Sequence, residues 1–264
     1  MDRRRVNKPH GRQQLDLDDV IYGVHAVEEA LAAGEKLRSL HVADERKRDP
    51  AVRKILEVAH EREVRVRFEN RGYFNQFPYK ATLGIIACGQ PFGYVTFEEV
   101  LHAPREGPGL FIVLDHITDP HNAGAIIRTA ECAGATGVIM PERRAAGVNP
   151  TVRKAAAGAA AHIPIARVSN IADAIRKLKK AAVWVAGADL GPESMDFTDA
   201  DFARDLALVI GAEGAGLSQL VKRECDYLVR IPMLGEVASL NASVAAGVLL
   251  YEAVRQRRAI AGTP

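Results

Sequence analysis

The sequence lacks the features that mark several large classes of protein. Its three cysteines, Cys88, Cys132 and Cys225, are odd in number and form no C-x-x-C pair, which argues against a disulfide framework and favours a reducing cytosol. No run of about 18 apolar residues occurs, so no membrane span is expected. The N-terminus contains arginines but no apolar stretch, unlike a secretory signal. We therefore expect a cytoplasmic protein that does not contact a membrane.

Common nucleotide-binding and hydrolytic motifs are missing as well. There is no P-loop of the form G-x-x-x-x-G-K-[ST] and no G-x-S-x-G, the commonest hydrolase signature. Residues 211–216 read G-x-x-G-x-G, which is not the dinucleotide fingerprint G-x-G-x-x-G. The eight histidines show neither H-x-x-x-H nor H-E-x-x-H spacing, although His116 and His121 share one loop. We expect no metal ion and no Rossmann-type NAD site.

Charge and length point to a globular protein of two domains, or of one domain of roughly 200 residues. The 264 residues are 48% hydrophobic and 26% charged, with a net charge of only +2. This composition can bury a large core, and the length exceeds that of a usual single domain. Residues 1–17 are basic and predicted to be disordered. This leader could contact phosphates, or it could be a solvated tail.

Residues 18–90 alternate short strands and helices, as in a small α/β domain. Apolar alternation predicts strands at 19–22, 40–43, 64–68 and 84–88, and helices at 24–32, 50–60 and 72–76. Residues 91–108 are rich in proline and glycine around one modest helix at 96–102, which is typical of a linker.

Residues 109–264 form a second, larger unit with regular β-α alternation. Strands are predicted at 110–114, 138–140, 163–166, 182–188, 206–210 and 227–231, and helices at 123–133, 150–161, 171–180, 218–224 and 242–256. Such alternation predicts a parallel sheet with helices on both faces. Ligands of open α/β sheets bind beyond the carboxyl ends of strands. Three polar or glycine-rich loops follow strands here, at 115–122, 211–216 and 233–241, and together they predict a pocket.

Single residues in these loops have structural as well as functional interpretations. Asn122 can cap the helix that follows it, and Arg128 can be a surface arginine that extends past apolar neighbours. Alternatively, Arg128 offers a fork of donors to a ligand phosphate. Ser239, Asn241 and Ser243 crowd the start of the last helix, where capping needs one or two polar residues.

The three loops resemble the three motifs of the SpoU (TrmH) family of RNA 2′-O-ribose methyltransferases, within the SPOUT superfamily. The matching segments are D-P-H-N-x-G-x-x-x-R-T-A at 119–130, V-I-G-A-E-G-x-G-L at 209–217 and I-P-M-x-G-x-x-x-S-L-N-x-S-V-A at 231–245. The segment Y-G-V-H-A-V-E-E-A-L at 22–31 resembles the start of the family's substrate-binding domain. The likeness spans residues 20–258 and is closest to bacterial members that methylate a guanosine of 23S rRNA.

The resemblance implies a fold and an assembly. It implies a small, ribosomal-protein-like α/β domain at 18–90 that binds the RNA substrate. Residues 109–264 would form a SPOUT methyltransferase domain with a parallel sheet and a deep trefoil knot. The family also works as homodimers, with sites built across the interface. Periodicity alone would not predict a knot, because knots are very rare among folds.

The resemblance also implies S-adenosylmethionine as cofactor. Carried over by position, its binding residues are Leu208, Gly211, Gly214, Ile231, Met233 and Leu240. The catalytic residues are Asn122, Arg128, Glu213, Ser239 and Asn241. In the implied reaction a ribose 2′-hydroxyl displaces the sulfonium of the cofactor at its methyl group. A guanidinium stays protonated in proteins, so we expect Arg128 to hold a phosphate and stabilise developing negative charge rather than act as a base.

One departure from the family concerns the small domain. Many relatives carry His-Gln-Gly where this chain has Thr82-Leu83-Gly84, so a family glutamine that contacts RNA is missing. Phosphate contacts are still available from basic residues of the domain, or these form a solvated charged face: Arg65, Arg67, Arg71 and Lys80. The first hypothesis is a 23S rRNA guanosine 2′-O-methyltransferase. Its rivals are a tRNA 2′-O-methyltransferase and a non-catalytic, knotted RNA-binding or assembly factor.

Overall fold

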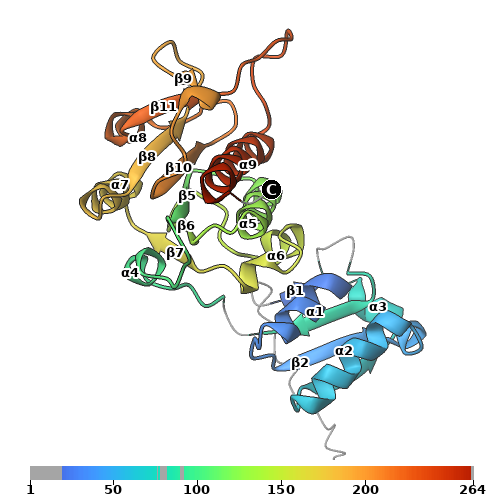
Figure 1. The fold of residues 1–264 in the computed structure, drawn as a ribbon. Coiled ribbons are helices and arrows are strands. Elements are labelled where there is room, and N and C mark those ends of the chain that lie inside the picture. The colour runs from blue at the N-terminus through green and yellow to red at the C-terminus, as the bar shows by residue number, and fades with distance from the viewer. Residues whose placement is uncertain (1–19, 76, 78–81, 90–91, 263–264) are drawn as a thin grey trace, which may run out of the picture.

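The computed structural model describes residues 20–75, 77, 82–89 and 92–262 in two α/β units (Figure 1). The basic leader at 1–17 and Lys80 lie outside these residues. No helix of the described ranges is both long and apolar enough to span a membrane.

The first unit is a mixed sheet with helices on both of its faces. Its four described strands lie in the order β1 (Val20–Tyr22), β4 (Ile85–Cys88), β2 (Ser39–Ala43) and β3 (Arg65–Glu69). β4 runs antiparallel to both of its neighbours, and β2 runs parallel to β3. The helices are α1 (Val24–Ala32), α2 (Pro50–Glu61) and α3 (Arg71–Phe74), with a 3₁₀ turn η2 (Asp44–Arg46). All of the strands and helices predicted for residues 18–90 are present, with boundaries shifted by one or two residues.

The second unit contains a seven-stranded sheet within the described residues. Its order is β7 (Ile165–Val168), β6 (Gly137–Pro141), β5 (Leu110–Asp115), β10 (Leu206–Gly211), β8 (Trp184–Ala188), β11 (Tyr227–Arg230) and β9 (Met195–Asp196). Every strand pair is parallel, as β-α alternation predicts. β9 is only two residues long and carries no periodic signal, so the sequence did not predict it.

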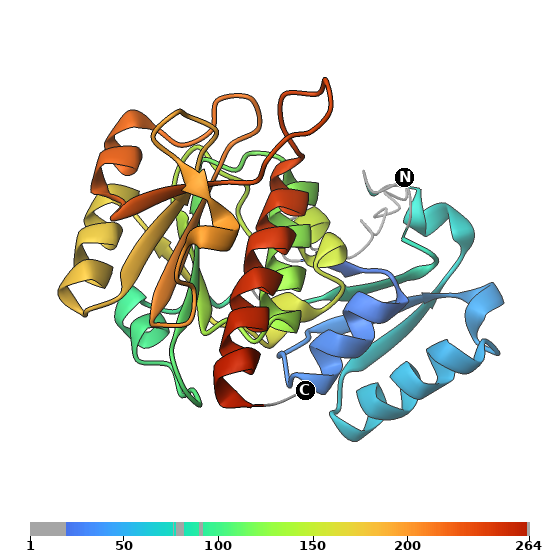
Figure 2. The same cartoon turned by 45° about the horizontal axis from the view of Figure 1, so that its top comes forward.

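Helices cover both faces of this sheet (Figures 1 and 2). α5 (Pro120–Cys132), α6 (Pro150–Ala155) and α9 (Ala242–Ala261) contribute to one hydrophobic core, with the 3₁₀ turns η3 (Ala159–Ala161) and η4 (Phe197–Asp199) beside it. α4 (Phe97–Leu101), α7 (Ile171–Lys180) and α8 (Gln219–Glu224) contribute to the core on the other face.

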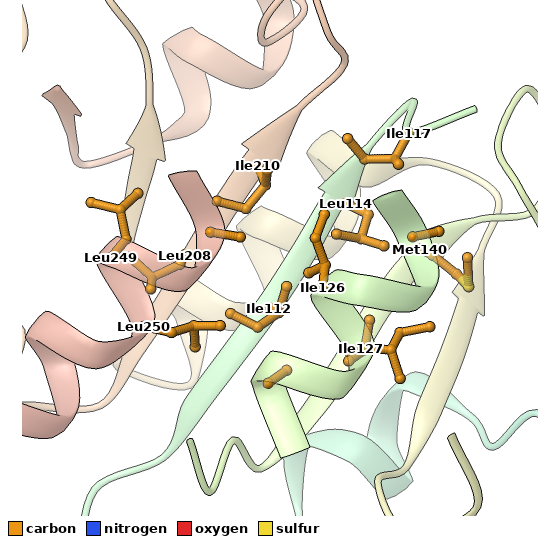
Figure 3. Packing of buried hydrophobic residues seen from close by; sticks show 14 of the residues in the cluster. Ile112, Leu114, Ile117, Ile126, Ile127, Met140, Leu208, Ile210, Leu249 and Leu250 are labelled. Atoms are coloured by element: carbon orange, nitrogen blue, oxygen red, sulfur yellow. The ribbon is translucent and has the colours of Figure 1, made fainter. Parts of the chain in front are cut away.

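The central strands are buried on both faces, which explains their continuous apolar sequence. Ile112 and Leu208 point toward α5 and α9, and meet Leu249 and Leu250 of α9 (Figure 3). Val113 and other alternate residues of the same strands pack on the opposite face. Burying each such side chain stabilises the fold by roughly 1.5–3 kcal/mol.

Two helix predictions were wrong at their C-terminal ends. The helix expected at 150–161 breaks after Ala155, because Ala157 and Gly158 adopt positive φ angles of 50° and 96°. The last helix continues to Ala261, five residues beyond the expected end, and finishes at Gly262 with φ 66°.

The segment expected to be a linker packs on the second unit. The backbone N–H of Val95 donates to the carbonyl of Ile165 at 3.0 Å. A capping box formed by Thr96 and Glu99 starts α4, and Phe97 and Val100 of this helix join the hydrophobic core. Residues 92–101 are therefore held firmly against the large sheet.

The two units also contact each other through charged side chains. Arg153 of α6, almost fully buried, donates to Glu35 at 2.8 Å. His162 lies 2.9 Å from Glu29 of α1. Gly158 lies so close to α1 that a Cβ at this position would be 2.2 Å from the Cβ of Glu29. A larger residue at 158 could not keep this contact.

Candidate functional site

Three predicted loops meet at the carboxyl edge of the large sheet. Because all strands are parallel, β5, β10 and β11 end at the same edge, and Gly211 lies opposite Asp115 in the ladder. The loops at 115–122, 211–216 and 233–241 follow these strands. In Figure 1 the loop at 233–241 is the long orange-red excursion at the top.

Asn241 connects all three loops. Its amide Nδ2 donates to the Oδ1 of Asn122 at 2.9 Å and also to the carboxylate of Glu213. Its Oδ1 accepts from the backbone N–H groups of Ser243 and Val244, at 2.9 Å and 3.4 Å. Asn241 is thus both the N-cap of α9 and the link between Asn122 and Glu213. This cluster can orient a polar substrate group by hydrogen bonds.

Asn122 is free for this contact because another residue caps its helix. α5 begins at Pro120, three residues earlier than expected, and the side chain of Asp119 accepts from the N–H groups of His121 and Asn122. Proline suits the first helical position, where no backbone N–H is needed. The prediction that Asn122 caps the helix was therefore wrong. Asn122 is instead 5% exposed and points to Asn241.

The two serines near Asn241 differ in their contacts. The Ser243 hydroxyl donates to the Oδ1 of Asn241 at 2.6 Å, so Ser243 supports the cap and is not the cap itself. Ser239 is exposed and makes no hydrogen bond within the described part of the chain. Of the two serines, only Ser243 contacts the cluster.

Arg128 is not brought into the cluster within one chain. It lies six residues after Asn122 in α5, which is about 240° around the helix axis, so the two side chains leave on different faces. Arg128 is exposed and has no hydrogen bond or ion pair to any described residue. Within one chain, Arg128 therefore makes no hydrogen bond or ion pair to Asn122, Glu213 or Asn241.

Asp115 belongs to the site geometry and was missed from the sequence. Although ionisable, it is 1% exposed; it accepts from the N–H of Ser218 at 2.7 Å and lies 2.6 Å from the Nδ1 of His116. His116 has a positive φ of 59°, which is rare outside glycine. Asp115 thus fastens the loop after β10 to the end of β5. A carboxylate directly after five apolar residues was the available signal.

Residues expected to bind the cofactor lie at different depths. Gly211 ends β10, and Gly214 turns the following loop with a φ of 74°. Ile231 and Met233 are half-buried after β11, and Leu240, at the entrance of α9, is more exposed. These apolar side chains, left incompletely covered, fit an organic cofactor at this edge. Leu208 differs, since it lies three residues inside β10 with its side chain in the core.

Gly211 is required by the chain itself. A Cβ at this position would lie 2.3 Å from the carbonyl carbon of Gly216 and 2.5 Å from the nitrogen of Leu217, both backbone atoms. This backbone contact is sufficient to explain a glycine at position 211.

We expect Gly211→Ala to displace the 211–217 loop and to destabilise the protein by about 1–3 kcal/mol, the usual cost of overpacking. The measurement is thermal unfolding together with cofactor affinity by calorimetry. Gly235→Ala is the control, because no atom lies within 4 Å of a Cβ there and its φ is not positive. Equal melting temperatures for the two variants would contradict the backbone contact.

Other candidate groups do not contribute to this site. Burial raises the pKa of Cys225 to about 12, and its thiol donates to the carbonyl of Val221, so it is not a ready nucleophile. A hollow of about 1040 Å³ lies at the opposite end of the domain, beside Thr136 and Arg257, and includes no residue of the cluster. Among the described residues, no three His, Cys, Asp or Glu side chains come together as metal ligands would.

Comparison with known families gives two matches that cover most of the chain. The profile of the SpoU rRNA methylase family matches residues 109–251. A second profile, for RNA 2′-O-ribose methyltransferase substrate binding, matches residues 20–82. The two matches coincide with the two units of the structure.

Individual relatives agree with these matches. The chain is 42% identical over 243 residues to the 23S rRNA (guanosine-2′-O-)-methyltransferase RlmB of Pseudomonas syringae, covering 90% of this chain and 96% of the relative. It is 39% identical to YacO of Bacillus subtilis, named for the TrmH family of tRNA/rRNA methyltransferases, over 92% and 97% of the two chains.

A solved structure shares the fold over nearly the whole length. The SpoU methyltransferase AviRb of Streptomyces viridochromogenes, in complex with the cofactor AdoMet, superposes with a TM-score of 0.77 at 29% identity. The match covers 91% of this chain and 90% of AviRb.

Proposed function

The chain belongs to the SpoU rRNA methylase family, and we propose that it methylates a ribose 2′-hydroxyl of a guanosine in 23S rRNA. The family uses S-adenosylmethionine. The hydrogen bonds of Asn241 with Asn122 and Glu213 at the carboxyl edge of the sheet support a site for methyl transfer. The choice of a guanosine in 23S rRNA rests on the 42% identity to the RlmB relative. An rRNA substrate would place the enzyme in the cytoplasm.

S-adenosylmethionine supplies a methyl group already activated on a sulfonium, so the protein mainly has to position the hydroxyl and manage its charge. Gly211, Gly214, Ile231, Met233 and Leu240 would form the cofactor's binding surface. Leu208 would contribute to cofactor binding only through its backbone, because its side chain lies in the core.

The polar residues would act on the substrate. Asn122 would orient the ribose, with Asn241 and Glu213 fixing the amide of Asn122 in place. Ser239, which is exposed and unpaired in the described chain, has a hydroxyl free to contact substrate. Arg128 would neutralise the negative charge that develops on the attacking oxygen, because a guanidinium offers several donors to one anion.

A homodimer would supply the missing arginine. The exposed position of Arg128 in one chain supports a site completed by a second copy. α9 offers an interface, since Val244 and Tyr251, two turns apart on one face, are 51% and 52% exposed. Leu234 and Val237 in the preceding loop are 98% and 76% exposed. Large apolar side chains exposed in this way are typical of a protein contact.

We also propose that the C-terminal domain is knotted. β11 lies two strands beyond β10, yet α9 packs back against β10 and α5. The chain between them, residues 231–241, must therefore return across the carboxyl edge beside the loop at 211–217. Passage through that loop would complete a trefoil.

The small domain would bind the RNA at a distance from the nucleotide that is methylated. Arg65 and Arg67 are exposed on the edge strand β3, and Arg71 starts α3. Leu83 is 59% exposed where many relatives carry glutamine, so this apolar side chain changes the RNA contact available there.

Methyl transfer from labelled S-adenosylmethionine to three unmodified RNAs tests the proposal. We expect label in 23S rRNA, recovered after nuclease digestion as 2′-O-methylguanosine, and about background label in 16S rRNA and tRNA. Label confined to tRNA would instead favour a tRNA substrate, which the name of the relative YacO also includes. Absence of cofactor binding by calorimetry would favour a non-catalytic RNA-binding factor.

A further inference from the structure

The loop after β6, residues 142–149, is held at three points. The N–H of Glu142 donates to the carbonyl of Val168 at 2.9 Å, and the N–H of Ala146 donates to the carbonyl of Ile117 at 2.9 Å. The N–H of Val148 donates to the Tyr94 hydroxyl at 2.7 Å. Ala146 and Val148 are buried in the core. The loop is thus a fixed part of the carboxyl edge.

Between the first two anchors the loop exposes two arginines. Arg143 and Arg144 have no hydrogen bond or ion pair to any residue that the structure describes. Arg144 also has a φ of 58°, a left-handed conformation that glycine adopts far more easily. Neither guanidinium has a role in folding, and one of them occupies a position that disfavours arginine.

A third guanidinium lies beside this pair. Arg167 of β7 stacks over the ring of Tyr94, 4.9 Å from its centroid, and donates to the carbonyl of Glu142 at 2.6 Å. Tyr94, Val95, Glu142, Arg143 and Arg167 line a shallow hollow of about 460 Å³. The hollow is therefore lined by two arginines and one glutamate, and Arg144 follows Arg143 directly in the chain.

This surface adjoins the catalytic edge. Its anchor Ile117 belongs to the loop that leads to Asn122, and β6 is the direct neighbour of β5. With strands about 5 Å apart, the loop at 142–149 lies roughly 10 Å across the sheet from the end of β10. A ribose at Asn122 would therefore lie at the same edge of the sheet as this loop, about one strand spacing away.

We propose that Arg143, Arg144 and Arg167 form a surface that binds the phosphate backbone of the RNA strand next to the target nucleotide. Guanidiniums suit this role because they present paired donors to phosphate oxygens. The Arg167–Tyr94 stack adds a flat surface on which a base can lie. This inference rests on the proposed function for the identity of the ligand as RNA.

The test measures RNA binding and methyl transfer in two variants, Arg143→Ala/Arg144→Ala and Arg144→Gly. In the double variant we expect the Kd and KM for 23S rRNA to rise about tenfold or more, with kcat at saturating RNA within about twofold of wild type. Cofactor affinity should not change. The slope of log K against log salt should fall by about one for each phosphate that the variant no longer binds.

Arg144→Gly separates binding from folding. Glycine tolerates the left-handed backbone at position 144. The melting temperature of the Arg144→Gly variant should therefore equal or exceed that of the wild type, while its affinity for RNA falls. The matched control is Lys180→Ala/Arg223→Ala. It removes two exposed charges that have no partner among the described residues, from α7 and α8 on the face of the sheet opposite α5 and α9.

RNA binding is followed by fluorescence anisotropy with both 23S rRNA and tRNA, so it does not depend on turnover. Unchanged affinity and salt slope in the arginine variants, or an equal loss in the control, would overturn the inference. Arginine-dependent binding without methyl transfer would overturn the proposed function alone.

Discussion

Asn241→Asp will fold like the wild-type chain and lose methyl transfer by about 100-fold or more. Aspartate keeps the oxygen that caps α9, and its negative charge suits a helix N-terminus. It cannot donate to Asn122 or Glu213, and it places a second carboxylate beside Glu213. The measurements are kcat/KM with labelled cofactor and thermal unfolding.

Asn241→Ala is the companion variant. It removes the cap as well as the donor, so it should lose activity to a similar degree and also lower stability by about 1 kcal/mol. That loss corresponds to a fall in melting temperature of roughly 2–4 °C for a chain of this size. Wild-type turnover in Asn241→Asp would show that Asn241 is only a cap.

Arg128→Ala will leave stability unchanged and reduce kcat by about 100-fold or more. Arg128 is exposed and unpaired in the described chain, so its removal breaks no contact within the fold. Lysine at this position keeps the charge but loses the paired donors, and we expect Arg128→Lys to recover only part of the activity. Activity near wild type in Arg128→Ala would contradict any role in the reaction.

Mixing subunits tests where Arg128 acts. If it completes the site of a second copy, inactive Arg128→Ala and inactive Asn241→Asp chains, unfolded and refolded together in equal amounts, should regain activity. Half of the dimers would then be mixed and each would hold one intact site, which predicts about a quarter of wild-type activity. Sites contained in single chains would give no recovery.

Local patterns were sufficient for most of the fold. Apolar periodicity predicted the strands at 110–114 and 206–210, because strands buried on both faces need continuous apolar sequence. It missed β9, which is too short to show a period. It also predicted one continuous helix where the structure has two helical segments separated at Ala157, because small residues give no sign of a left-handed backbone.

For the site, local sequence was enough to indicate which loops lie at the carboxyl edge and which residue types they carry. β-α alternation makes the strands parallel, and parallel strands end at one edge. The resemblance of the three motifs to those of a known family then implied Asn122, Glu213 and Asn241 as candidates.

Which of these residues touch became evident only from the three-dimensional packing. Asn122 and Asn241 are 119 positions apart, and their hydrogen bond depends on α9 returning to pack beside α5. Arg128 is close to Asn122 in sequence, yet the helical turn directs it elsewhere. Gly211 is fixed by a backbone crossing with Gly216, and Asp115 by a contact with Ser218. The contacts of Asn122 with Asn241 and of Asp115 with Ser218 arise from the packing of distant segments, which local sequence patterns do not encode.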